Sequence, residues 1–147
     1  MDDAEHRRLG VETYNRCWEL LEIEDRTSEG DLELLRTAFT SRYHWSYVAE
    51  APQAIMGDWM ISRAAAATGE GHLALRYARL AYDAAVAHDV EDWLLASSAE
   101  GVARAYAALG DGDQRDEWWV TSEGLVALIA DDESRELIAS QLGSVPR

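Results

Sequence analysis

Hydrophobic residues recur at spacings of three and four along most of the chain. In the first such segment, Leu9, Tyr14, Trp18 and Leu21 follow this spacing, which places them on one face of an amphipathic helix. The pattern predicts seven helices, and no alternating apolar run is long enough to predict a strand. The expected helices run from about 4 to 23, through 32–47, from 52 to 68, from 73 to 88, from 93 to 109, through 118–129 and from 131 to 143.

Turn signals separate these segments. Gly69-Glu70-Gly71 and Gly110-Asp111-Gly112 interrupt the helical pattern, and Pro52 suits the first turn of a new helix. Since the connections are short, successive helices are expected to pack as antiparallel hairpins. We therefore expect one all-α domain over residues 1–147, with stacked hairpins at 4–48, 51–88 and 91–130 and a C-terminal capping helix over 131–143.

An internal repeat supports the stacked arrangement. Residues 62–71 align without gaps to residues 103–112, and six of the ten positions are identical at an offset of 41 residues. The shared residues include an arginine, Arg63 and Arg104, and two glycines in each copy. The same offset places Trp18 on Trp59, which suggests a diverged third copy near the N-terminus.

This helix–glycine turn–helix unit resembles the tetratricopeptide repeat. Ala103, Tyr106 and Gly110 fall where that motif has a small residue, a tyrosine and the turn glycine. Gly69, Ala74 and Ala81 match the turn glycine and two small packing positions in the earlier copy. The period is 41 rather than about 34 residues, so the helices are expected to be longer than usual. The resemblance implies a superhelix in which the first helix of each pair lines a concave groove.

The groove positions implied by the resemblance are Trp59 and Arg63 in one copy and Glu100 and Arg104 in the next, with Ser97 beside them. Each pair is four residues apart and therefore shares a helix face. Two arginines there could hold one carboxylate or phosphate. Alternatively, Glu100 neutralises both arginines in an internal network. Trp59 likewise either packs in the core or offers its ring as a surface on which a ligand stacks.

Charge excludes several classes of partner. Acidic residues number 28 against 13 basic ones, for a formal charge of −15, and every basic residue is an arginine. A nucleic-acid binder needs a basic face, and an anionic membrane would repel this chain. The absence of lysine excludes Schiff-base chemistry and a phosphate-binding P-loop.

The N-terminus lacks the pattern of a signal peptide and no apolar run approaches 18 residues, so a cytoplasmic location is expected.

Two features remain as candidate chemistry. Cys17 is the single cysteine, which excludes an intramolecular disulfide, and it either packs as an apolar residue or reacts. The stretch Tyr43-His44-Trp45-Ser46-Tyr47 spreads its aromatic side chains around most of a helix, so some of them must meet a neighbour, a partner or a ligand. His44 either packs or serves as an acid, base or metal ligand.

These observations favour a non-enzymatic binding or scaffold module without a cofactor. It would hold a partner peptide, or a second copy of itself, in the helical groove. The alternatives are a small-molecule or metal-binding protein with its site around His44, Trp45 and Trp59, or a purely structural homodimer. The candidate binding residues are Trp59, Arg63, Ser97, Glu100, Arg104, His44 and Trp45.

Overall fold

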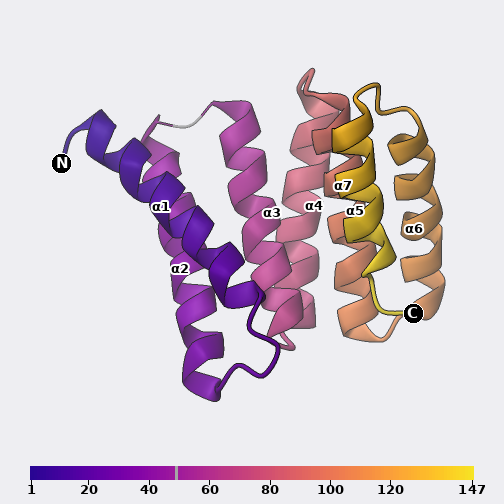
Figure 1. Ribbon diagram of the computed structural model, residues 1–147, viewed down its shortest axis with the longest axis horizontal. Helices are drawn as coiled ribbons and strands as arrows, with labels where there is room; N and C mark the ends of the chain where they lie inside the picture. The colour runs from indigo at the N-terminus through magenta and orange to yellow at the C-terminus, as the bar shows by residue number, and fades with distance from the viewer. Residues whose placement is uncertain (49) are drawn as a thin grey trace.

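The computed structural model describes residues 1–48 and 50–147, and every regular element in them is a helix (Figure 1). This confirms the all-α prediction. In the same residues, no helix combines the length and the apolar character needed to cross a membrane. The helices are α1 Asp3–Leu21, α2 Ser28–Val48, α3 Ala51–Ala67, α4 Gly71–Ala87, α5 Asp92–Leu109, α6 Gly112–Ala127 and α7 Asp132–Gly143.

Capping groups and glycines set several helix ends. Asp2 and Glu5 form a capping box at the start of α1, which satisfies backbone N–H groups that lack partners within the helix. Asp131 accepts a hydrogen bond from the backbone of Ser134 at the start of α7. Gly69 and Gly110 adopt φ values of 80° and 76°, a region that glycine enters without steric cost. These two residues therefore allow the sharp turns after α3 and α5.

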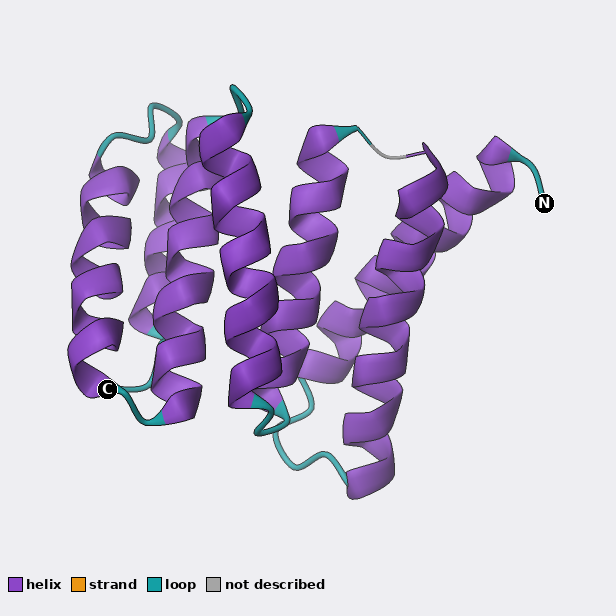
Figure 2. Cartoon of the chain, turned by 180° about the vertical axis from the view of Figure 1, so that it is seen from behind, coloured by secondary structure: helices purple, strands orange, loops and turns teal. Residues whose placement is uncertain are grey.

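Neighbouring helices pack as antiparallel pairs, as expected. α1 contacts α2, α3 contacts α4 and α5 contacts α6, and Figure 2 shows the three hairpins from behind. The first helices of the hairpins also meet, since α3 contacts both α1 and α5. α7 is the shortest helix and packs against α5 and α6 at the C-terminal end (Figure 1). α1, α3, α5 and α7 thereby come to surround a common space.

Small residues bring the central helices close together. Ala74, Ala78, Ala81 and Ala85 are spaced by three and four residues along α4 and are all buried. Such a stripe lets α4 approach α3 and α5 closely, because it has no large side chains to separate the axes. The larger buried side chains of α3, including Met60, fill the space beside it. This packing fixes α3 and α5, which carry the candidate groove residues.

A glycine also sets the approach of α1 to α2. The indole of Trp45 is buried and lies directly over Gly10, where a Cβ atom would overlap the ring. The hydroxyl of Ser41 donates a hydrogen bond of 2.7 Å to the carbonyl oxygen of Gly10. A side chain at Gly10 would therefore push the two helices apart and stretch this bond.

We predict that Gly10→Ala lowers the free energy of unfolding by about 1–3 kcal/mol, because the added methyl group overpacks the contact with Trp45. Gly124→Ala is the matched control, since its added Cβ meets no atom within 4 Å. That change should raise stability by about 0.5–1 kcal/mol through better helix propensity. Urea denaturation followed by circular dichroism measures both, and equal effects would contradict the packing argument.

Candidate functional site

A largely apolar cavity of about 340 Å³ lies between α1, α3, α5 and α7. Each of these helices contributes side chains to its wall, so the cavity exists only once all four have packed together. Its volume falls within the range of about 300–1,000 Å³ typical of ligand pockets. The lining residues are Tyr14, Trp18, Met56, Trp59, Trp93, Leu94, Ser97, Leu137, Ile138 and Gln141.

Trp59 is a fixed part of this cavity wall. Its ring nitrogen donates a hydrogen bond of 3.0 Å to the backbone oxygen of Ser97, which ties α3 to α5. The ring of Trp18 lies 5.7 Å away between centroids. On the other side, Gly101 has no side chain, and a Cβ there would lie only 3.0 Å from the Trp59 ring. Trp59 is therefore buried in the core and also lines the cavity.

A second hollow of about 160 Å³ follows along the same two helices. Arg63 comes one turn after Trp59 on α3, and Arg104 comes two turns after Ser97 on α5. Both arginine side chains line this hollow. Its remaining lining residues are Ala66, Ala67, Ala107, Ala108 and Pro146.

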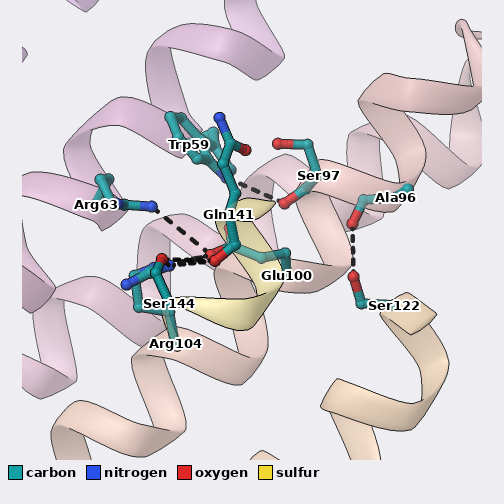
Figure 3. Close-up of polar contacts among 9 residues, drawn as sticks. All are labelled: Trp59, Arg63, Ala96, Ser97, Glu100, Arg104, Ser122, Gln141 and Ser144. Carbon is teal, nitrogen blue, oxygen red and sulfur yellow. Dashed lines mark hydrogen bonds and ion pairs between the residues drawn. The ribbon is translucent and has the colours of Figure 1, made fainter. Parts of the chain in front are cut away.

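A buried carboxylate, that of Glu100, lies beside both arginines (Figure 3). Glu100 has no exposed surface. Its Oε1 accepts hydrogen bonds from Nε and Nη2 of Arg104 at 2.8 and 2.6 Å. Nη2 of Arg104 also donates to the backbone oxygen of Gln141 at 2.9 Å and to the hydroxyl of Ser144 at 2.7 Å. Arg104 therefore neutralises Glu100 and fastens the end of α7 to α5.

Arg63 is far less well compensated. Its Nη1 forms an ion pair with Oε1 of Glu100 at 3.7 Å, so Glu100 contacts both arginines as in the internal network considered above. This distance is beyond hydrogen-bond reach, and Nη1 is buried without a hydrogen-bond partner among the described residues. The guanidinium carbon lies 5.8 and 5.9 Å from the ring centroids of Trp18 and Trp59, which gives a modest cation–π attraction. Burial, and then repulsion by Arg104, lower the pKa of Arg63 to about 10, although Glu100 opposes this shift.

The cluster carries an unbalanced charge and unsatisfied polar atoms. Two arginines face one carboxylate, so one positive charge is left over. Oε2 of Glu100 and Oε1 of Gln141 are also buried without hydrogen-bond partners in the described part of the chain. An unsatisfied buried group costs roughly 1–3 kcal/mol. The two oxygens are closed off from solvent, so a ligand in the second hollow could meet only the exposed part of the Arg63 side chain.

The structure does not bring all the predicted site residues into one cavity. Trp59, Ser97, Glu100 and the two arginines gather along α3 and α5. His44 and Trp45 lie on α2 outside both hollows. The ring of Trp45 packs 5.3 Å from that of Tyr14 and borders a different hollow, whose other lining residues are Arg7, Val11, Val48, Glu50 and Gln53.

Several lining residues were not among the predicted site residues. Trp93 precedes Ser97, Glu100 and Arg104 at spacings of four, three and four, so the helix face alone could have identified it. Gln141 and its neighbours on α7 carry no such signal, because spacing within a helix does not say where a capping helix will lie.

Comparison of the chain with family models, with curated proteins and with solved structures found no match in any of the three. The site must therefore be interpreted from its own geometry. Over residues 1–48 and 50–147, no group of three or more histidine, cysteine, aspartate or glutamate side chains is arranged to hold a metal ion.

Cys17 takes no part in either hollow and is fully buried. Burial raises the pKa of its thiol to about 12, so the reactive thiolate is scarce at neutral pH. We predict that iodoacetamide at pH 8 leaves Cys17 unmodified in the folded protein and modifies it readily in urea. Mass spectrometry measures the difference. Equal labelling rates in the two states would show that the thiol is accessible.

The two arginines should differ in their effect on stability. We predict that Arg104→Met lowers the free energy of unfolding by about 3 kcal/mol or more, because Glu100 loses its only hydrogen-bonded cation. Arg63→Met should leave stability within about 1 kcal/mol of the wild type, since it removes a buried and poorly compensated charge.

Chemical denaturation of the two variants tests this asymmetry. The substituted side chains are the same, so differences in side-chain volume and helix propensity cancel. If both variants lose stability equally, Arg63 is a structural partner of Glu100 and its charge is not available for a ligand.

Proposed function

We propose that the chain is a binding module whose groove along α1, α3, α5 and α7 holds a segment of a partner chain. A large apolar side chain of that segment would enter the cavity beside Trp59, and a carboxylate would pair with Arg63. The observation that carries the proposal is the buried, incompletely neutralised guanidinium of Arg63 at the edge of an aromatic cavity.

The linings of the two hollows favour a polypeptide as the occupant. Arg63 and Arg104 line the second hollow, where an acidic side chain or a chain end can supply an anion, and the first hollow is lined mainly by apolar and aromatic side chains. A purely apolar ligand would leave Arg63 without an anion. A peptide with an acidic residue close to a large apolar residue supplies both parts in one molecule.

The dimensions suit a short segment. The two hollows extend along α3 from Met56 to Ala67, which corresponds to about 16 Å of helix axis. An extended chain covers this length with about five residues. Burying one Leu- or Phe-sized side chain contributes roughly 1.5–3 kcal/mol, and a charge-assisted hydrogen bond contributes roughly the same. Loss of either contact should therefore weaken binding by about tenfold or more.

A binding role is favoured over a catalytic one. Among the described residues that line the two hollows there is no histidine and no cysteine. These are the side chains that most often transfer protons or attack substrates near neutral pH. Glu100, the buried acid beside the two arginines, is committed to Arg104.

A small aromatic carboxylate is the second candidate ligand. The 340 Å³ cavity is walled by four helices, and such a compound would fill it and reach Arg63 without any peptide backbone. It would leave most of the second hollow unfilled, which makes it the weaker fit of the two.

Selection from a random peptide library displayed on phage tests the proposal. We predict that the wild-type chain enriches peptides with a large apolar residue close to an acidic residue or a free C-terminus. Arg63→Met should weaken binding of the enriched peptides at least tenfold, because the anion loses its partner. Arg36→Met is the matched control, since Arg36 is exposed on α2 and, among the described residues, pairs only with Glu29.

Three outcomes would count against the peptide. If no peptide is enriched, the groove is not a peptide-binding site. If Arg63→Met and Arg36→Met weaken binding equally, the effect comes from the lost positive charge and not from the position of Arg63. Full competition by small aromatic carboxylates, with no peptide enriched, would favour the second candidate. Enriched peptides that match a stretch of this sequence would identify a second copy of the chain as the partner.

A further inference from the structure

Two histidines that are far apart in the sequence meet between α1 and α2. His6 lies in the first turn of α1 and His44 lies near the end of α2. Their Nδ1 atoms are 3.0 Å apart. Both imidazoles are only partly buried, so solvent and ions can reach them. The contact is separate from the groove, because neither histidine lines either of its hollows.

Tyrosines hold both rings in place. The ring of Tyr47 stacks on that of His6, with centroids 4.2 Å apart and an interplanar angle of 7°. The ring of Tyr43 meets that of His44 edge-on at 5.7 Å. The two tyrosine hydroxyls are hydrogen-bonded at 3.0 Å, which ties the supporting rings to each other. These contacts restrict the orientations of the two imidazoles before a ligand arrives, while the partly exposed rings can still adjust.

The distance between the two Nδ1 atoms is close to that between two nitrogen ligands of one metal ion. Zinc–imidazole bonds are about 2.0–2.1 Å long, so two nitrogens on one tetrahedral ion lie about 3.3 Å apart, and on a square-planar ion about 2.9 Å. The observed 3.0 Å lies between these values. The ion would lie off the line that joins the two nitrogens, so binding requires both rings to rotate toward it as well as a shift of a few tenths of an ångström. Two partly exposed side chains have that freedom.

We propose that His6 and His44 form a binding site for one divalent transition-metal ion, with Zn²⁺ as the probe ion. Both Nδ1 atoms would be ligands, and water would complete the coordination shell. The two tyrosine hydroxyls are hydrogen-bonded to each other, so the tyrosines support the rings without acting as ligands.

The proton balance of binding is simple. In the neutral pair one Nδ1 carries a proton and the other accepts it. On binding, the donor ring shifts that proton to its own Nε2, so both Nδ1 lone pairs face the ion and no proton is lost. The charge of −15 favours cations near the chain, and two of its acidic residues, Asp3 and Glu5, lie in the first turn of α1 near His6 in the sequence.

Zinc titration calorimetry on untagged protein at physiological salt tests the site. We expect one Zn²⁺ per chain for the wild type. His6→Gln and His44→Gln should each weaken this binding at least tenfold, because each removes one of two ligands. His88→Gln is the matched control, since His88 lies at the far end of α4 and should leave binding unchanged.

A second measurement needs no variant and keeps the test decisive if either substitution unfolds the hairpin. Zinc should shift the Nδ1 resonances of His6 and His44 in ¹⁵N NMR of the wild type, and leave those of His72 and His88 in place. The proposal fails if the wild type binds no zinc, if the His6 and His44 variants bind it as tightly as the wild type does, or if other nitrogens shift instead. The two histidines would then be only a hydrogen-bonded pair.

Discussion

The centre of the structure depends on the compensation of one buried carboxylate. Glu100 has no exposed surface, and an ionised acid cannot stay in such a place without cations and hydrogen bonds. Arg104 supplies both, and the same guanidinium reaches the end of α7 through Gln141 and Ser144. The neutralisation of Glu100 therefore also sets the position of the helix that completes the cavity. The neutralisation of Glu100 and the position of α7 therefore depend on the same guanidinium, that of Arg104.

The two arginines have different surroundings although they occupy equivalent places in the repeat. Arg104 uses its donors on Glu100 and α7, whereas Arg63 lies against two tryptophan rings without a hydrogen bond for Nη1. Proteins keep unsatisfied buried charges mainly where function requires them.

A second, independent feature lies at the other end of the molecule, where α1 and α2 hold a pair of histidines between tyrosines. Both regions combine a polar group with aromatic neighbours that fix its position.

Much of the architecture follows from local pattern. The number of helices, their approximate ends and the turns at Gly69 and Gly110 could be predicted, because helical periodicity and glycine conformation are properties of short segments. Arg63 and Arg104 line the same hollow, which is consistent with their alignment at an offset of 41 residues and with their spacing on the helix faces. The histidine pair could not be predicted, because His44 meets a residue 38 positions away. Nothing in the spacing around His44 indicates such a partner.

The sequence by itself determined seven helical segments, their pairing as hairpins and the faces that carry Trp59, Arg63, Glu100 and Arg104. Only the tertiary structure decided that α7 closes the cavity, that Arg104 is fully paired while Arg63 is not, and that His6 meets His44. The physical reason is the range of the interactions. Periodicity and capping act within one or two turns of helix, whereas ion pairing and desolvation depend on distances that exist only after separate helices have packed.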